Sequence, residues 1–173
     1  NIKINFDNIF LIGMMGSGKS TVAKLLANKI GLPFLDIDNE LEKIIDMSIN
    51  EIFYNYGEKR FRLIESTFFK ECSKLNNYIY ATGGGIILEK NNRFVLKNRG
   101  ITFFLDCSVE TITKRLENNQ ESNKRPLINN NFINTIENLY KKRYSLYKSS
   151  SAYSINTDLL SPEEVVSQIE KNI

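Results

Sequence analysis

One short segment near the start of the chain limits most strongly what this sequence can fold into. Residues 13–20, GMMGSGKS, match the pattern G-x-x-x-x-G-K-[ST], in which the backbone N–H groups of a glycine-rich loop surround phosphate oxygens. An apolar run at residues 9–12 precedes this loop, and a helical pattern of apolar residues at 19–30 follows it. The positive end of that helix would face the same phosphates. The order strand, loop, helix therefore predicts a nucleotide site in an α/β fold.

Short apolar runs alternate with longer amphipathic segments along the rest of the chain, which predicts a parallel sheet covered by helices. The expected strands are residues 9–12, 33–37, 78–82, 101–106 and 152–156. The expected helices are residues 19–30, 58–75, 109–118 and 132–148, and a last one that starts at Ser161. Neither a repeat nor a linker divides the sequence, so residues 1–173 are expected to form a single domain.

The composition excludes several classes of function. The 173 residues include no histidine, so a Ser-His-Asp triad and a histidine-ligated metal site are both impossible. A net charge of +3, without a clustered basic stripe, argues against a nucleic-acid partner, and no apolar run approaches the ~20 residues of a membrane span. Cys72 and Cys107 have no CxxC spacing, which suits a reducing compartment, and we expect a cytoplasmic protein.

Other motifs narrow down the use of the nucleotide. The chain has no NKxD motif for guanine and no apolar strand that ends in Asp-Glu, which argues against a GTPase and an ATP-driven motor. The polar segment at residues 118–131, NNQESNKRPLINNN, reads either as a surface loop or as a lid over an active site. Together with the small size of the chain, the lid interpretation favours phosphoryl transfer to a small molecule.

Candidate ligand-binding residues follow two of the expected strands. Asp36 and Asp38, two apart at the end of a strand, would share one face, where one could serve a metal and the other a substrate hydroxyl. They could also simply cap the next helix. The glycine triplet at 83–85 follows another strand and allows close approach of the backbone to a ligand, unless it is only a flexible turn.

Three arginines complete this set: Arg62, Arg125 and Arg143. Each of them alone reads as a solvated surface charge. Together they could bind a carboxylate and the transferred phosphate, because a guanidinium recognises both groups through two parallel hydrogen bonds.

These motifs, taken in order along nearly the whole chain, resemble those of the shikimate kinase family. They are the phosphate loop, Asp-x-Asp at 36–38, Gly-Glu-x-x-Phe-Arg at 57–62, Gly-Gly-Gly at 83–85, Arg-Pro-Leu at 125–127 and Arg-Tyr-Ser-Leu-Tyr at 143–147. The resemblance implies ATP-dependent phosphorylation of the 3-hydroxyl of shikimate, on the route to aromatic amino acids. It also implies a three-layer fold of the nucleoside-monophosphate-kinase type, with five parallel strands in the order 2-3-1-4-5. A substrate-binding helical region at residues 37–65 and a lid at 115–131 belong to the same pattern.

The resemblance further implies a role for each site residue. Asp38 would be the base, assisted by Lys19 and Arg125, and Mg²⁺ would be held by Ser20 and, through water, by Asp36. The residues implied for ATP are Gly16, Ser17, Gly18, Lys19, Ser20, Thr21, Arg115 and Arg125. Those implied for shikimate are Asp38, Phe53, Phe61, Arg62, Glu65, Gly83, Gly84 and Arg143. In the second set Arg62 and Arg143 would hold the carboxylate, and Glu65 would orient Arg62.

Two departures from the family pattern concern the adenine end of the site. The lid is longer than usual between Arg115 and Arg125, and an arginine common in relatives is missing near Thr157, so adenine contacts there would come from Thr157 or from the backbone. Rival interpretations are another small-molecule kinase of the same architecture, such as one for gluconate or a nucleoside monophosphate, and a nucleotide-binding regulatory module. We expect ATP and shikimate as partners, and a monomer, because the sequence has no apolar stripe typical of an interface.

Overall fold

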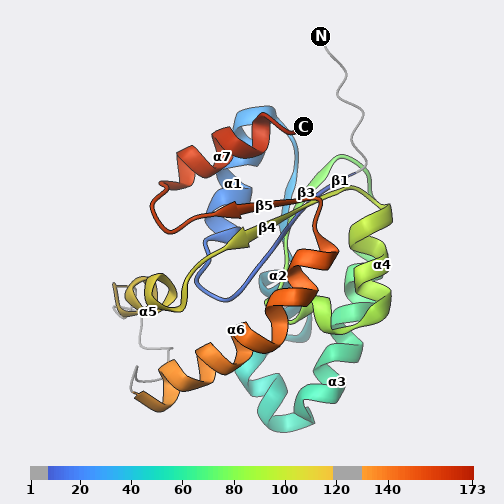
Figure 1. The fold of residues 1–173 in the computed structure, drawn as a ribbon. Coiled ribbons are helices and arrows are strands. Elements are labelled where there is room, and N and C mark those ends of the chain that lie inside the picture. The colour runs from blue at the N-terminus through green and yellow to red at the C-terminus, as the bar shows by residue number, and fades with distance from the viewer. Residues whose placement is uncertain (1–7, 119–129) are drawn as a thin grey trace.

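The computed structural model of the chain describes residues 8–118 and 130–173 (Figure 1). Five strands form one parallel sheet in the order β2-β3-β1-β4-β5, which confirms the order predicted above. The strands are β1 (Asn8–Ile12), β2 (Phe34–Asp36), β3 (Tyr78–Ala81), β4 (Ile101–Asp106) and β5 (Tyr153–Asn156).

Helices cover both faces of this sheet, as crossover connections between parallel strands require. They are α1 (Lys19–Ile30), α2 (Ile37–Ile45), α3 (Ile49–Cys72), α4 (Lys90–Asn98), α5 (Val109–Asn118), α6 (Asn130–Ser150) and α7 (Pro162–Glu170), with a short 3₁₀ turn η1 (Ile86–Leu88). Figure 1 shows α1 and α7 side by side on one face, with α3, α4 and α6 on the other.

The core consists of two apolar clusters separated by the sheet. Successive side chains of β1 point to opposite faces, so Ile9 and Leu11 pack against α1 and α7 while Phe10 and Ile12 pack under the other helices. All five residues of β1 are buried. A strand covered on both faces and paired on both edges is a rigid support, and the phosphate loop starts directly from its end.

The end of β2 corrects one expectation. β2 stops at Asp36, and Asp38 lies in the first turn of α2, so the expectation that the two acids share one face of a strand is wrong. The helix starts early because Ile37 and Leu41, four residues apart, both pack into the core. The Asp36 side chain caps this helix by accepting a hydrogen bond from the Asn39 N–H at 3.1 Å.

The helix expected at residues 58–75 is longer at its start and contains a break. α3 begins at Ile49, after a capping box between Ser48 and Glu51, and it ends at Cys72. Gly57 interrupts it with φ 79° and ψ 163°, a conformation that is open essentially only to glycine. The segment after the break carries Glu58, Phe61 and Arg62 of the Gly-Glu-x-x-Phe-Arg motif, and Glu65 follows three residues later.

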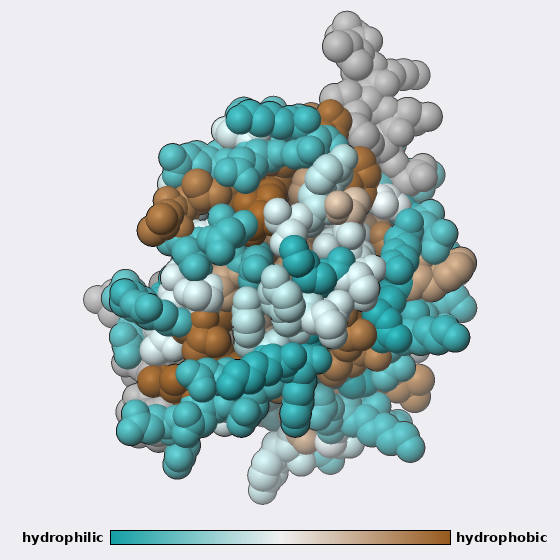
Figure 2. Space-filling model, viewed as in Figure 1, coloured by the Kyte–Doolittle hydropathy of each residue, from teal (hydrophilic) through white to brown (hydrophobic). Residues whose placement is uncertain are grey.

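None of the helices in 8–118 and 130–173 is long and apolar enough to cross a membrane. On the face shown in Figure 2, hydrophilic residues cover most of α6 and α7, and apolar residues are visible in separate groups.

Candidate active site

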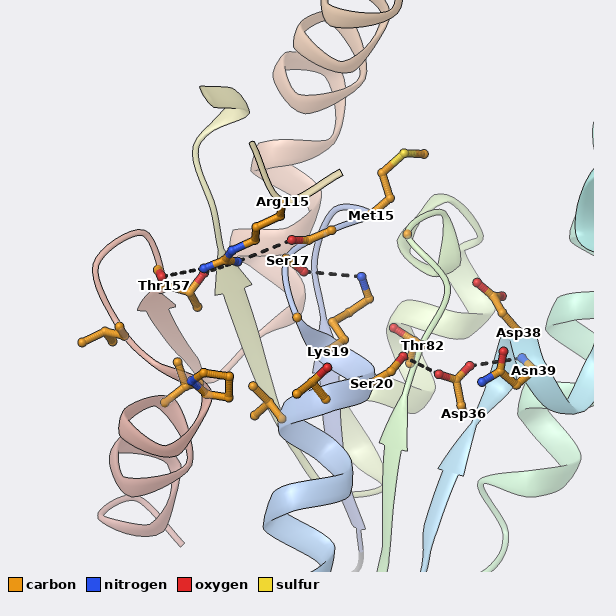
Figure 3. A pocket seen from close by; sticks show the side chains of 18 residues that line it. Met15, Ser17, Lys19, Ser20, Asp36, Asp38, Asn39, Thr82, Arg115 and Thr157 are labelled. Atoms are coloured by element: carbon orange, nitrogen blue, oxygen red, sulfur yellow. Dashed lines mark hydrogen bonds between the residues drawn. The ribbon is translucent and has the colours of Figure 1, made fainter. Parts of the chain in front are cut away.

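A cavity of about 610 Å³ opens at the carboxyl ends of the central strands. Its walls come from the phosphate loop, the β2–α2 junction, the segment after β3, α5 and the turn before α7. Figure 3 shows Arg115 and Thr157 at one side of the cavity and Asp36 and Asp38 at the other, with Lys19 between them. This is the edge where parallel α/β sheets bind ligands, because several loops converge there.

The phosphate loop has a backbone conformation with positive φ angles, which glycine adopts easily. Gly13, Gly16 and Gly18 all have positive φ, and α1 begins immediately afterwards at Lys19. The Nζ of Lys19 donates hydrogen bonds to the carbonyl oxygens of Gly13 at 2.8 Å and Met14 at 2.7 Å. Burial lowers the pKa of Lys19 to about 8, against the opposing effect of Asp38 and Asp36. All six loop and helix residues predicted for ATP line the cavity: Gly16, Ser17, Gly18, Lys19, Ser20 and Thr21.

The two residues predicted for Mg²⁺ lie in contact with each other. The Ser20 hydroxyl donates a hydrogen bond to the carboxylate of Asp36, and both residues line the cavity. Hydroxyl and carboxylate oxygens are the ligands that Mg²⁺ prefers, and this ion is usually held by one or two protein groups together with substrate phosphates. The oxygen atoms of Ser20 and Asp36 are therefore suitable ligands for Mg²⁺. The same Asp36 side chain also caps α2.

Asp38 lies beside the same cavity in a different environment. Its Oδ1 is buried and has no hydrogen-bond partner among the described residues. Burial raises the pKa of Asp38, while the Lys19 ammonium opposes the shift. A carboxylate with an unpaired oxygen and a raised pKa is suited to accept a proton from a ligand hydroxyl.

Arg62 and Glu65 form a buried ion pair on α3. Arg62 Nη1 lies 2.7 Å from Glu65 Oε2, while its Nη2 lies 3.4 Å from Oε1 of the more exposed Glu58. The guanidinium also sits near the rings of Phe53 and Phe61, with centroids 5.7 and 5.1 Å from Cζ. Burial raises the pKa of Glu65 to about 7, although Arg62 opposes the shift. The Nε of Arg62 and the Oε1 of Glu65 are buried without a described partner, so this pair still has hydrogen-bonding capacity.

The glycine triplet after β3 lies between these charged groups. A Cβ atom on Gly83 would come within 2.7 Å of both Asp38 Oδ1 and Glu65 Oε1, and one on Gly85 within 2.3 Å of Arg62 Cζ. On Gly84 it would lie 3.7 Å from Arg143 Nη1. Side chains at positions 83 and 85 would therefore collide with the site. The triplet brings Asp38, Arg62, Glu65 and Arg143 together, although they come from three different helices.

Arg115 is fixed at the opposite end of the cavity. Its Nη2 donates to the carbonyl oxygen of Thr157 at 2.9 Å, and its Nη1 lies 3.3 Å from Thr157 Oγ1 and 3.4 Å from the Gly16 carbonyl oxygen. Arg115 thus joins the phosphate loop to the turn after β5. Arg125 and residues 119–129 of the predicted lid lie outside the described part of the chain.

One residue beside the site was not predicted to have a role. The Tyr147 hydroxyl donates a hydrogen bond to the Gly84 carbonyl oxygen at 2.5 Å. Tyr147 ends the motif at 143–147 that contributed to the family resemblance, but nothing in the sequence connects it to a glycine 63 positions earlier in the chain.

Comparisons with known proteins agree on one family. A family model described as shikimate kinase matches residues 15–173. The shikimate kinase of Caldicellulosiruptor saccharolyticus is 40% identical over 163 residues, covering 94% of this chain and 92% of its own. That of Thermodesulfovibrio yellowstonii is 41% identical over 165 residues, with coverages of 95% and 93%. Among solved structures, shikimate kinase from Acinetobacter baumannii in complex with shikimate has a TM-score of 0.88 at 34% identity, covering 95% of this chain and 91% of that one.

Proposed function

The chain belongs to the shikimate kinase family, and we propose how its residues divide the work of ATP-dependent phosphorylation of shikimate. It is an enzyme of the phosphoryl-transfer class. We assign the phosphate loop to ATP and the group around the glycine triplet to shikimate, with transfer to the 3-hydroxyl. The observation that carries this assignment is that one glycine triplet contacts Asp38, Glu65 and Arg62 on one side and approaches Arg143 and the phosphate loop on the other.

The acceptor side of the site is suited to a carboxylic acid with hydroxyl groups. Arg62 and Arg143 supply two guanidinium groups near Gly84 and Gly85, and a guanidinium binds a carboxylate through two parallel hydrogen bonds. Glu65 holds Arg62 from the buried side. We assign Phe53 and Phe61, whose rings pack against each other, to an apolar wall beside the ring of shikimate. Asp38 then faces the hydroxyl groups of the bound acid.

The transfer itself needs alignment and neutralisation of charge more than covalent assistance. In our assignment Asp38 accepts the proton of the attacking hydroxyl, and Lys19 lies against the moving phosphoryl group. Mg²⁺, held by Ser20 and by Asp36 through water, would neutralise charge on the phosphates when bound. We include Arg125 in this assignment on the basis of its Arg-Pro-Leu motif alone, as a lid residue that would bind the phosphates of ATP. We assign Arg115, which is hydrogen-bonded to Thr157, to the adenine end.

A panel of acceptors tests this proposal. ADP release would be followed with MgATP and shikimate, gluconate or AMP as the acceptor. We expect turnover with shikimate alone, since a nucleotide acceptor would need a base-binding pocket and gluconate has no ring to lie against Phe53 and Phe61. Turnover with another acceptor would keep the phosphate site but reject the roles of Arg62 and Arg143. ATP binding without any turnover would favour a regulatory module.

The same proposal includes the compartment, the oligomeric state and the partners of the enzyme. We assign it to the cytoplasm as a monomer without a nucleic-acid or membrane partner. Cys72 and Cys107 are free thiols, as is usual in a reducing compartment, and burial raises the pKa of both. Size-exclusion chromatography with light scattering would test the monomer directly.

A further inference from the structure

Tyr147 occupies a central position beneath the site. Its side chain is fully buried on α6, with the ring stacked on Phe104 at a centroid distance of 5.0 Å. Its hydroxyl donates to the Gly84 carbonyl oxygen and lies 3.6 Å from the Met14 sulfur of the phosphate loop. No other hydrogen bond to that carbonyl is present in residues 8–118 and 130–173. Burial raises the pKa of Tyr147 to about 12, so the hydroxyl remains a donor at neutral pH.

The bond to Gly84 fixes more than one carbonyl group. The peptide between Gly84 and Gly85 is planar, so the direction of the Gly84 carbonyl also sets the direction of the Gly85 N–H. Two adjacent glycines have wide backbone freedom, and a peptide between them is easily turned unless something holds it. The hydrogen bond from the Tyr147 hydroxyl fixes the orientation of the Gly84–Gly85 peptide.

The same peptide separates the two arginines of the site. On the Gly84 side, Arg143 Nη1 lies 3.7 Å from the position of a Cβ atom, and on the Gly85 side Arg62 Cζ lies only 2.3 Å from the equivalent position. Arg62 therefore packs flat against the backbone, and a turned peptide would push it away. Arg143 precedes Tyr147 by one helical turn, so both side chains leave α6 on the same face.

We propose that the Tyr147 hydroxyl is a positioning group for substrate: by holding the Gly84–Gly85 peptide it sets the spacing of Arg62 and Arg143 and thereby the affinity for the carboxylate of shikimate. This inference rests on the proposed assignment of the two arginines. Tyr147 acts through the backbone and the arginines, and it does not touch the reacting atoms. Its contact with Met14 places the same hydroxyl between the nucleotide loop and the acceptor loop.

Tyr147→Phe tests the proposal, because it removes the hydroxyl and keeps the ring that stacks on Phe104. Tyr80→Phe is the matched control. Tyr80 is also fully buried and stacked on a phenylalanine, and its hydroxyl donates to the Cys72 carbonyl oxygen at 2.6 Å, at the end of α3 and not in the triplet. Both variants lose one hydrogen bond from a buried tyrosine to a part-buried backbone carbonyl, so their effects on stability should be similar.

The readout is the Michaelis constant of each substrate, with the melting temperature measured alongside. For Tyr147→Phe we expect the KM for shikimate to rise roughly 5- to 50-fold, as for loss of one buried hydrogen bond, with the KM for ATP within about twofold of wild type. For Tyr80→Phe we expect both constants to stay at wild-type values.

Three results would overturn the proposal. These are an unchanged KM for shikimate in Tyr147→Phe, an equal rise in both constants, and a Tyr147→Phe protein that fails to fold while Tyr80→Phe folds, which would assign the hydroxyl to stability alone. Failure of the proposed function is recognised separately, because the wild-type enzyme would then show no saturable turnover with shikimate.

Discussion

The guanidinium of Arg62 is bound from both sides by carboxylates in very different surroundings. The Glu65 side chain, 2.7 Å away, is 0% exposed, whereas the Glu58 side chain, 3.4 Å away, is 58% exposed. A desolvated partner is far more effective than one screened by water. Glu65 therefore fixes the orientation of Arg62, and Glu58 is a weak outer contact that a bound carboxylate could replace.

Replacing Glu65 should disable shikimate binding without affecting ATP. Removal of one partner from a buried, hydrogen-bonded charge pair costs ~2–5 kcal/mol, so we expect Glu65→Gln to raise the KM for shikimate by about 30-fold or more at pH 8. Steady-state kinetics with each substrate varied in turn measures this effect. The matched control is Glu58→Gln, for which an exposed pair predicts a change of less than about fivefold. Equal effects of the two substitutions would contradict the ranking of the two contacts.

Arg143 should behave as the second half of the same carboxylate site. We expect Arg143→Ala to raise the KM for shikimate far more than the KM for ATP, because its guanidinium lies beside Gly84 and is assigned to the substrate carboxylate. Lys142→Ala, which removes an exposed charge from the neighbouring position, should leave both constants unchanged. An Arg143→Ala enzyme with normal shikimate kinetics, or with both constants raised alike, would remove Arg143 from the site.

Asp38→Asn should separate catalysis from nucleotide binding. Loss of a general base lowers kcat by roughly 10²- to 10⁴-fold, and we expect a decrease in this range while the dissociation constant for MgATP stays the same. Calorimetric titration and single-turnover kinetics measure the two quantities. Asp46→Asn is the control at the other end of α2, where the left-handed conformation at φ 56° suits asparagine equally well. A near-normal kcat in the Asp38→Asn enzyme would reject the role of Asp38 as the general base.

The stability of the substrate-free protein should decrease as the pH rises through the range in which Glu65 ionises. Its pKa is about 7 in the folded chain, against an ordinary value of 4.5, so between these values the unfolded chain has released a proton that the folded chain retains. Fewer bound protons in the unfolded state mean that the free energy of unfolding falls with rising pH, here by on the order of 3 kcal/mol. Urea unfolding of wild type and Glu65→Gln at pH 5 and pH 8 measures this. The wild type should lose stability relative to the variant, and parallel curves would show that Glu65 is not the group involved.

The sequence predicted the frame of the fold because its strongest signals are local. The loop at 13–20 requires a strand before it and a helix after it, and Ser161 starts α7 as its N-cap with Pro162 at the first helical position. α1 and α5 have the predicted bounds. In these segments the spacing of the apolar residues and the capping residues indicate the same helix, so tertiary contacts do not shift its ends.

Elements whose form depends on distant contacts were missed or misplaced. α4 has asparagines in its first turns, and its helix is stabilised by Val95 and Leu96 in the core rather than by propensity. β2 is too short for its alternation to be distinguished from the helix that begins at Ile37. The ion pair of Arg62 with Glu65 was implied by family resemblance, while the bond from Tyr147 to Gly84 had no local signal, because it joins segments that only folding brings together.

The strand order also determines when in folding the site can exist. Among the described strands, β1, which carries the phosphate loop, pairs with β3 and β4 alone, and its first pairing partner in β3 is Tyr78. A growing chain that ends before residue 78 therefore has the loop but neither neighbour of its strand, and it lacks the glycine triplet altogether. Such distant pairings form slowly, because the entropy of closing the intervening chain is lost before the contacts are gained. Both substrate sites should consequently mature in one late step, and a refolding chain should recover nucleotide binding and shikimate binding at the same rate.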